Sequence, residues 1–247
     1  MAVALMDAVR LDKILSQLGY GTRSEVKKLV SSGKIFLNGS PVRKPETKFD
    51  PSSDILLYDG KRIDYDLYEY WVLNKPAGIL SAVSDSRQKT VIDYMNLKRK
   101  GLSPCGRLDK DTEGLLLVTD DGPLIHRLLA PGKHVDKTYE VTAEGILPPD
   151  AEKRFREGIV LSDVEKCLPA DLKISEPGNP FRARVVIREG KYHQIKRMFE
   201  TLGCRVTSLK RTAMGPLKLS ELGLKTGEYR KLTENEIQEI RGINDRS

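Results

Sequence analysis

Residues 106–122 read GRLDKDTEGLLLVTDDG and join a polar turn to a short apolar run. The run Leu115–Val118 is closed by Asp121 and Gly122, which predicts a buried strand that ends in a turn. Arg107 and Asp109 lie in the turn before this strand. A carboxylate at the edge of a core can be shielded from water and set beside a cation. We therefore expect chemistry at Asp109.

The composition favours a polyanionic partner. The 247 residues include 42 Lys or Arg and 35 Asp or Glu, a net charge of +7, and the length allows two domains. Residues 182–211 alone hold nine Lys or Arg, against only Glu189 and Glu200. The basic character is thus concentrated in one part of the chain.

The cysteines and apolar segments argue against secretion and membrane insertion. Cys105, Cys167 and Cys204 are too far apart for a disulfide framework or a paired metal motif. The apolar stretch Ala2–Met6 has no basic leader, and no run approaches the roughly 20 apolar residues that a spanning helix needs. We expect a cytoplasmic protein that does not associate with membranes.

The first 66 residues predict a small module of two helices and hairpins. Apolar residues at helical spacing predict a helix from Leu11 to Leu18, stopped by Gly19. Thr22 and Glu25 have capping-box spacing and begin a second helix, which Gly33 ends. Strands at 35–37 and 55–58 lead into Asn-Gly and Asp-Gly turns. Residues 64–68 are a plausible linker.

Residues 67–247 predict a larger α+β domain built mainly on antiparallel strands. A strand is expected at 70–73, and apolar residues alternate with arginines over 181–188, which predicts a strand with one basic face. A helix with an apolar stripe follows over 195–202 and ends at Gly203. A capping box at Thr233 predicts a final helix.

Four separated stretches resemble the RsuA/RluA-type pseudouridine synthases, in particular the RsuA/RluB type with an N-terminal S4 domain. The resemblance is closest to the RsuA (16S rRNA) subgroup. The four stretches are residues 74–78 (NKPAG), 106–122, 137–139 (KTY) and 189–198 (EGKYHQIKRM). The resemblance implies isomerisation of uridine to pseudouridine in ribosomal RNA without a cofactor or metal. It also implies that Asp109 is the nucleophile.

The resemblance implies roles for three further residues. Tyr139 is expected to pack on the target uracil and relay a proton, and an aromatic ring can stack on an extruded base. Lys196 is expected to pair with Asp109, because a buried carboxylate without a cation would take up a proton. Arg107 is the alternative partner, unless it binds phosphate near the cleft.

Residues 10–63 resemble the S4 RNA-binding domain, and residues 1–44 carry eight Lys or Arg against three acids. Cations on one helix can hold a phosphate backbone without reading its sequence. The expected RNA contacts in this domain are Arg10, Lys13, Arg23, Lys27, Lys28 and Lys34. Those expected in the second domain are Lys75, Arg182, Arg184, Arg188, Lys191, His193 and Arg197.

Other polar residues receive simpler interpretations. Asp111, Asp120 and Asp121 are expected to act in turns, and His126 and His134 are left out of the site. Asp109–Gly114 with Asp120 also has the spacing of a calcium-binding loop, although the last acid is a short Asp and a strand follows. A calcium site is therefore a weaker alternative.

The expected partner is ribosomal RNA or a ribosomal assembly intermediate, bound by a monomer. The subgroup resemblance implies small-subunit (16S) RNA, with uridine 516 as the target. The alternatives are a large-subunit (23S) pseudouridine synthase and a non-catalytic S4 assembly factor. The assembly factor would keep the basic faces and would not need Asp109, Tyr139 and Lys196 together.

Overall fold

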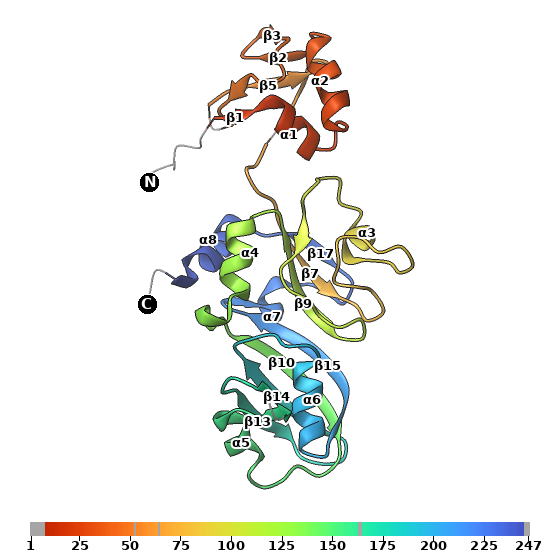
Figure 1. Ribbon diagram of the computed structural model, residues 1–247, viewed down its shortest axis with the longest axis vertical. Helices are drawn as coiled ribbons and strands as arrows, with labels where there is room; N and C mark the ends of the chain where they lie inside the picture. The colour runs from red at the N-terminus through yellow and green to blue at the C-terminus, as the bar shows by residue number, and fades with distance from the viewer. Residues whose placement is uncertain (1–7, 52, 64, 163–164, 245–247) are drawn as a thin grey trace. The chain divides into compact units, whose positions relative to one another are not determined.

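The computed structural model describes residues 8–51, 53–63, 65–162 and 165–244 (Figure 1). The apolar stretch Ala2–Met6 and the start of the expected linker, Asp64, lie outside these residues. The chain forms two compact units. The first comprises the described residues up to Glu69 together with Asn96–Leu102, and the second comprises Tyr70–Met95 and the described residues from Ser103 onward.

The first unit packs two helices on small antiparallel sheets. Leu11, Ile14, Val26 and Val30 are fully buried between the helices and the strands, so the expected apolar faces form its core. Both capping-box bonds between Thr22 and Glu25 are present. The elements are β1 (Val9–Arg10), α1 (Leu11–Gln17), α2 (Arg23–Ser31), β2 (Ile35–Leu37), β3 (Ser40–Val42), β4 (Lys48–Phe49), β5 (Leu56–Tyr58) and β6 (Lys61–Arg62), with β3-β2-β5-β6 in one sheet and β1-β4 in another.

Asn96–Leu102 belongs to the first unit although it comes later in the chain. The Lys100 amide donates to the Gln17 carbonyl at 2.8 Å, and its side chain donates to the Gly21 carbonyl at 3.0 Å. Arg99 donates to the carbonyls of Asp66 and Leu67, both at 2.8 Å. Nothing in the local sequence pattern predicts this return of the chain.

A nine-stranded sheet forms the second unit. Its main order is β13-β14-β10-β15-β9-β7-β17, with β8 paired to β9 and β16 to β15. Only the β15–β9 pairing is parallel among the described strand pairs of this sheet. The strands are β7 (Tyr70–Lys75), β8 (Ser103–Pro104), β9 (Glu113–Thr119), β10 (Lys137–Glu144), β13 (Asp171–Glu176), β14 (Phe181–Ile187), β15 (Arg205–Met214), β16 (Leu217–Lys218) and β17 (Tyr229–Lys231).

Helices cover one face of the β13-β14-β10 part of this sheet. Phe199 on α6 (Gln194–Thr201) packs edge-on against Phe155 on α5 (Ala151–Glu157), at 5.5 Å between ring centroids, and lies 6.1 Å from Phe181 on β14. The remaining elements are α3 (Val91–Met95), α4 (Gly122–Leu129), η1 (Pro131–Lys133), α5 (Ala151–Glu157), β11 (Val160–Ser162), β12 (Glu165–Lys166), α6 (Gln194–Thr201), α7 (Leu219–Leu222), α8 (Glu234–Arg241) and η2 (Gly242–Asn244).

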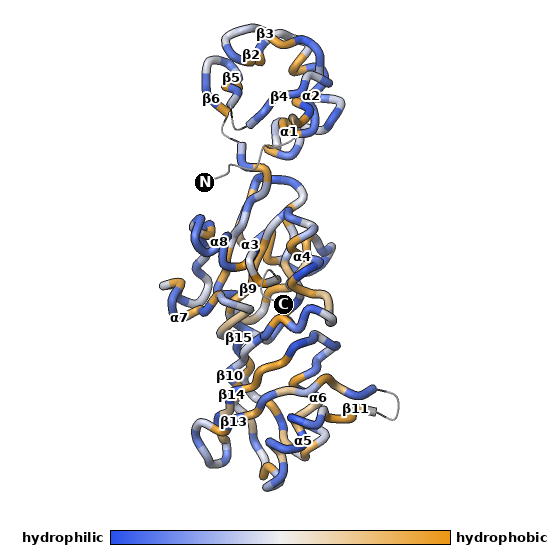
Figure 2. Tube along the Cα trace, turned by 90° about the vertical axis from the view of Figure 1, so that its left-hand side faces the viewer, coloured by the Kyte–Doolittle hydropathy of each residue, from blue (hydrophilic) through white to orange (hydrophobic). Residues whose placement is uncertain are grey.

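The expected strand over 181–188 is present and alternates as predicted. Phe181, Ala183 and Val185 are buried toward the helices, whereas Arg182 and Arg184 are exposed on the opposite face. Apolar segments along this sheet are visible in Figure 2. The outer face is mixed in charge, because Arg184 lies opposite Glu140 and Arg182 forms an ion pair with Glu176 at 3.4 Å.

The end of β9 corrects one expectation. Asp121 and Gly122 do not form a simple turn, because Asp121 is the N-cap of α4 and accepts a hydrogen bond from the Leu124 amide at 3.0 Å. Asp121 also accepts from the Tyr70 hydroxyl at 2.7 Å. The local sequence does not decide between the two, because an Asp before a Gly-Pro pair suits both a turn and a helix start.

Gly114 allows β9 to pass close to β15. Its φ is +105°, and a Cβ at this position would lie 2.2 Å from the carbonyl oxygen of Arg211. Only glycine fits such an approach without moving the neighbouring backbone. Gly114 therefore sets the position at which the Asp109 loop enters the sheet.

In the described part of the chain, no helix is long and apolar enough to cross a membrane.

Candidate active site

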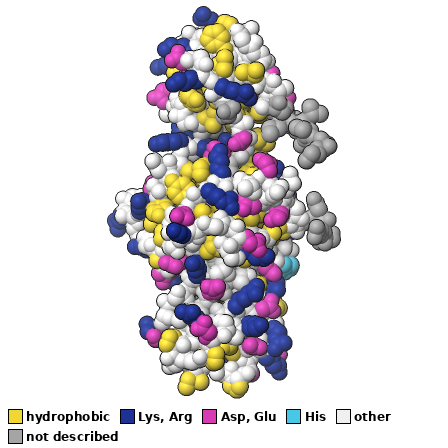
Figure 3. All heavy atoms as spheres, turned by 180° about the vertical axis from the view of Figure 1, so that it is seen from behind, with side chains coloured by type: hydrophobic (Ala, Val, Ile, Leu, Met, Phe, Trp, Pro, Cys, Tyr) yellow, Lys and Arg dark blue, Asp and Glu magenta, His cyan; other side chains and the backbone are white. Residues whose placement is uncertain are grey.

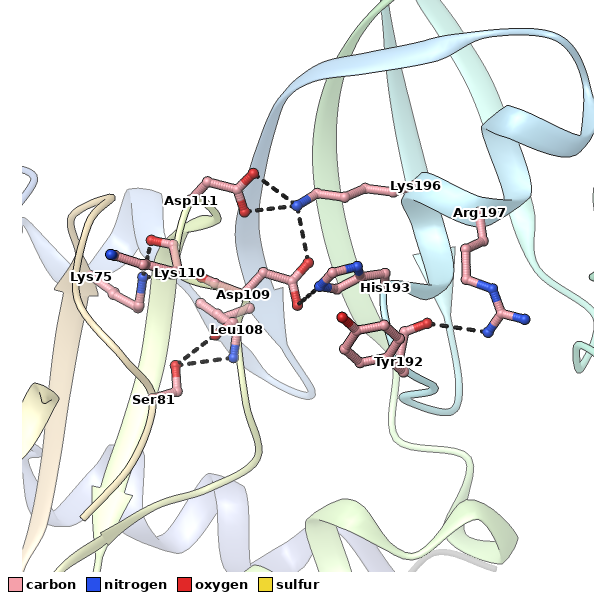
Figure 4. A network of polar contacts seen from close by, with 10 residues as sticks. All are labelled: Lys75, Ser81, Leu108, Asp109, Lys110, Asp111, Tyr192, His193, Lys196 and Arg197. Carbon is pink, nitrogen blue, oxygen red and sulfur yellow. Dashed lines mark hydrogen bonds and ion pairs between the residues drawn. The ribbon is translucent and has the colours of Figure 1, made fainter. Parts of the chain in front are cut away.

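The Asp109 loop joins β8 to β9, and Lys75, the last residue of β7, contacts its backbone (Figure 4). Lys75 is fully buried, and its ammonium group donates to the carbonyls of Asp109, Lys110 and Thr112 at 3.2, 3.2 and 2.9 Å. Burial lowers the pKa of Lys75 to about 8, although the nearby carboxylates of Asp111 and Asp109 partly offset it. This lysine fixes the backbone of the loop.

The segment after Lys75 adds further bonds to the same loop. The Gly78 amide donates to the Lys110 carbonyl at 2.7 Å. The buried Ser81 hydroxyl donates to the Leu108 carbonyl at 2.9 Å and accepts from the Leu108 amide at 3.1 Å. Residues 75–81 thus support the backbone on both sides of Asp109.

Two basic side chains face the Asp109 carboxylate, one toward each oxygen (Figure 4). Lys196 Nζ lies 3.2 Å from Oδ2, and His193 Nε2 lies 3.6 Å from Oδ1. The Asp109 side chain is 27% exposed and the Lys196 side chain 20%. The carboxylate is therefore partly shielded from water but still accessible to a substrate.

Lys196 is shared between two carboxylates. Its ammonium group donates to both oxygens of Asp111 at 2.7 and 2.9 Å. Burial disfavours the charge on Lys196, but the hydrogen bonds to Asp111 and Asp109 outweigh it and raise its pKa. The bond from Lys196 lowers the pKa of Asp111. The expectation that Asp111 acts only in a turn is therefore wrong.

His193 lies in a tightly held turn before α6. Its φ is +47°, a left-handed conformation that few residues other than glycine adopt. Gln194 accepts from the Lys191 amide at 3.0 Å and donates to the buried Glu189 at 2.9 Å. Glu189 also accepts from the Leu168 amide at 2.7 Å. This network fixes the direction in which His193 projects.

Tyr139 is buried on the sheet face that α6 covers. It is 6% exposed, and strand register places it opposite Val185 on one side and Arg211 on the other. Arg211 in turn lies opposite Gly114, at the end of the Asp109 loop. Tyr139 is thus two strands across the sheet from the start of β9.

Arg211 is a buried cation that the sequence reasoning did not single out. It is 2% exposed and donates from Nε to the Leu115 carbonyl at 2.7 Å, which ties β15 to β9. The neighbouring Lys137 is also buried, and its pKa is lowered by burial and by Arg211. Their residue types alone gave no signal, because most Arg and Lys side chains are exposed.

Four other candidate residues of this unit are exposed to solvent or are buried against the backbone of the Asp109 loop. Full burial of Lys75 is inconsistent with the expected RNA contact, because its donors are taken by backbone carbonyls. Arg107 is exposed, and among the described residues it forms no ion pair, so Lys196 is the cation that Asp109 meets. Arg182 and Arg184 lie on the face opposite to α6, away from Lys196.

Two further expected RNA contacts are held by an acid. Arg197 donates to Glu165 at 2.5 Å, and Lys191 lies 3.9 Å from the same carboxylate. The bond from Arg197 lowers the pKa of Glu165. Arg188 is likewise engaged, with Asp136 at 3.0 Å and Asp171 at 2.8 Å. Each of these cations is therefore paired with an acid of the protein itself.

The basic residues of the first unit are exposed, as RNA contacts require. Arg10 forms two bonds with the buried Asp12, at 3.0 and 2.8 Å, so it also holds the start of α1. Seen from behind, the molecule shows Lys and Arg side chains interspersed with Asp and Glu (Figure 3). The exposed residues are Arg10, Lys13, Arg23, Lys27, Lys28 and Lys34.

The acids of the calcium-like pattern are arranged differently from an ion-binding loop. Asp109 and Asp111 both face Lys196, and Glu113 begins β9. Within the described residues there is no group of three or more His, Cys, Asp or Glu side chains that could hold a metal ion.

Comparisons with known proteins identify the family of the chain. The model of the RNA pseudouridylate synthase family matches residues 69–201, and that of the S4 domain matches residues 9–55. The chain is 42% identical to the uncharacterized RNA pseudouridine synthase YtzG of Bacillus subtilis, over 93% of this chain and 97% of the relative.

Relatives named for both ribosomal subunits are also similar. The ribosomal small subunit pseudouridine synthase A of Yersinia pestis is 38% identical over 94% of this chain and 98% of its own. The ribosomal large subunit pseudouridine synthase B of Bacillus subtilis is 34% identical over 96% and 97%. A crystal structure of a pseudouridylate synthase superposes with a TM-score of 0.62 at 34% identity, covering 94% of this chain and all of that one.

The chain therefore belongs to the RNA pseudouridylate synthase family and carries an S4 domain. It is an isomerase of the pseudouridine synthase class. The expected fold, a small S4 domain followed by a mainly antiparallel α+β domain, is confirmed.

Proposed function

We propose that this enzyme converts a uridine of ribosomal RNA to pseudouridine, with Asp109 as the reacting carboxylate. The observation that carries the proposal is the contact of Asp109 with Lys196 at 3.2 Å, on a loop held by Lys75. The contact with Lys196 and the rigid loop together fix the direction of the carboxylate.

The reaction breaks the bond between uracil N1 and the ribose carbon C1′, turns the base, and joins C5 to C1′. The C5 proton is then lost, so no oxidant or reductant is consumed. Bond breaking builds positive character on the sugar and negative charge on uracil. Asp109 is suited either to attack the sugar carbon or to remove a proton from it.

Lys196 and Tyr139 have separate proposed roles. Lys196 holds the orientation of Asp109 and shares its charge with Asp111, so it is a positioning residue. Tyr139 is proposed to pack against the uracil and to relay the proton from C5, which its place on the α6-covered face near the start of β9 supports.

The basic residues of the S4 domain are proposed to hold the RNA backbone. Extruding a base from a helix costs a few kcal/mol, which phosphate contacts can offset. We expect affinity for ribosomal RNA fragments to fall steeply with salt concentration. An affinity that barely changes between low and physiological salt contradicts this electrostatic role.

We propose small-subunit RNA as the substrate, with large-subunit RNA as the second candidate. A relative named for the small subunit is 38% identical and a relative named for the large subunit is 34% identical, which favours the first. Pseudouridine mapping in both ribosomal RNAs of a strain lacking this protein identifies the missing modification. Uridine 516 is the site that the subgroup resemblance names.

The same strain tests the role of Asp109. Reintroducing the wild-type protein should restore the missing pseudouridine, whereas Asp109→Asn should not, although it keeps the size of the side chain. Binding of the RNA should survive the substitution. Full modification by the Asn variant removes the proposed role of Asp109 and revives the non-catalytic assembly factor as the alternative.

A further inference from the structure

Tyr192 is a large aromatic residue that folding leaves outside the core. Its exposed fraction is 75%, whereas that of Tyr139 is 6%. A ring this exposed contributes little to the buried apolar surface that stabilises a fold. The turn before α6 therefore presents an aromatic face to solvent at a place where stability does not require one.

The position of this ring relates it to the reacting carboxylate. Tyr192 stacks on His193 with 3.8 Å between ring centroids and 20° between planes. His193 Nε2 lies 3.6 Å from Asp109 Oδ1. Figure 4 shows the two rings together, with His193 pointing toward Asp109. Tyr192 thus lies one stacked ring further out from the site.

The backbone beneath the ring is fixed. Arg197 donates to the Tyr192 carbonyl at 3.3 Å, and Gln194 accepts from the Lys191 amide at 3.0 Å. The Arg197 amide also donates to the His193 carbonyl at 3.0 Å. A preformed face loses little conformational freedom when a ligand stacks on it.

We propose that Tyr192 is a stacking site for a nucleobase next to the target uridine. This inference rests on the proposed placement of the target ribose at Asp109. A neighbouring nucleotide is joined to that ribose by a single phosphodiester, so its base lies close to the site. Tyr192, stacked on His193, is within the surroundings that such a base can reach. Tyr192 offers the neighbour a flat face that accepts any base, because every base has a π-face.

This site would help to keep the target nucleotide out of its helix. Extrusion separates the target from the bases on which it stacked, and a flanking base on Tyr192 regains part of the lost stacking. The charge nearby suits the connecting phosphate, since Lys191 and Arg197 together outweigh Glu165 by one unit of charge.

Variants at Tyr192 separate the ring from its hydroxyl group. The full chain is compared with Tyr192→Phe, which keeps the ring, and Tyr192→Leu, which keeps bulk without it. Ile146→Ala serves as a matched control, because Ile146 is 88% exposed and apolar. Thermal unfolding should show all four proteins equally folded, since neither side chain is buried.

The probe is an RNA fragment that the wild-type enzyme modifies, taken from either the small-subunit or the large-subunit RNA. Two versions carry the fluorescent base 2-aminopurine, one before and one after the target uridine. We expect wild type and Tyr192→Phe to quench the fluorescence at one flanking position, and Tyr192→Leu not to. The KM of Tyr192→Leu should rise about tenfold, while Phe and the Ile146 control stay near wild type.

Several results overturn the inference. Quenching and a KM that are unchanged in Tyr192→Leu contradict stacking on the ring. A Tyr192→Phe variant that behaves like Tyr192→Leu also contradicts it, because the hydroxyl group is then the active part of the side chain. A fall in kcat alone with unchanged quenching also contradicts stacking. Failure of the proposed function has a different readout, which is full activity of Asp109→Asn. The quenching measurement does not depend on that result and still tests whether a base stacks on Tyr192.

Discussion

The side-chain nitrogen of Lys75 lies 3.2 Å from the carbonyl oxygen of Asp109 and so contacts the backbone of the loop that carries this carboxylate. The same nitrogen reaches the carbonyls of Lys110 and Thr112. The site is therefore built in two layers. One lysine holds the backbone of the loop, and another, Lys196, holds the carboxylate.

Replacing Lys75 should lower both the stability of the fold and the rate of the reaction. In Lys75→Met the buried carbonyls lose a charged donor, so the free energy of unfolding should fall by about 2–4 kcal/mol. The rate constant of a single turnover should fall by roughly 10²-fold, because Asp109 shifts. Denaturant titration and single-turnover assays measure the two effects.

The exposed neighbour Lys110 provides the control for stability. Lys110→Met should change the free energy of unfolding by no more than about 0.5 kcal/mol. Equal losses in the two variants contradict a special role for Lys75.

The pKa of Lys75 also predicts a pH dependence of stability. Its folded-state pKa of about 8 lies below the usual value of 10.5. Between these values the unfolded chain binds more protons, so this group makes the free energy of unfolding rise with pH, by up to about 3 kcal/mol. The difference between wild type and Lys75→Met should widen from pH 8 to pH 10.5. Parallel curves contradict the lowered pKa.

The two carboxylates that share Lys196 should not be equivalent. Lys196→Met should lower kcat by about 10²- to 10³-fold, because Asp109 loses its cation. Asp111→Asn should change kcat by less than about tenfold, since Lys196 keeps its contact with Asp109 at 3.2 Å. Steady-state kinetics on one RNA substrate compares them, and a larger loss in the Asp111 variant reverses the assignment.

The close approach of β9 and β15 predicts a severe effect at Gly114. In Gly114→Ala the new Cβ would lie 2.2 Å from the Arg211 carbonyl at a φ of +105°. We expect a loss of at least about 3 kcal/mol in stability, or no folded protein. Gly122→Ala is the matched control, because no atom lies within 4 Å of its added Cβ. Thermal unfolding of both variants should separate them clearly.

An ion pair at the start of α8 predicts an acid-sensitive contribution. The two bonds from Arg230, at 2.8 and 2.7 Å, lower the pKa of Glu236 to about 2 from its usual 4.5. This group stabilises the fold above pH 4.5, and the stabilisation is lost as the pH falls toward 2.

The matching substitution is Glu236→Gln. Because the pair is partly exposed, its loss should cost only about 1–2 kcal/mol at pH 7. The two proteins should converge near pH 2 in denaturant titrations. A gap that stays constant with pH rules out the carboxylate as the cause.

Much of this protein follows from local sequence pattern. The helices over Leu11–Gln17 and Arg23–Ser31 and the alternating strand Phe181–Ile187 were predicted, because apolar periodicity and capping residues act within a few positions. The α+β fold with an S4 domain followed from motifs at known spacing. The pairing of Asp109 with Lys196 was also anticipated, from a motif and from the need of a buried acid for a cation.

Other features depend on which distant segments the tertiary structure brings together. Lys75 looked like an RNA contact until strand pairing buried it under a loop 34 to 37 residues later. Asp111 looked like a turn residue, yet it meets Lys196 across 85 residues of chain. The placement of Asn96–Leu102 in the first unit is of the same kind. A cation's role depends on whether folding leaves it in water or surrounds it with carbonyls, and sheet register decides that over distances that local patterns do not span.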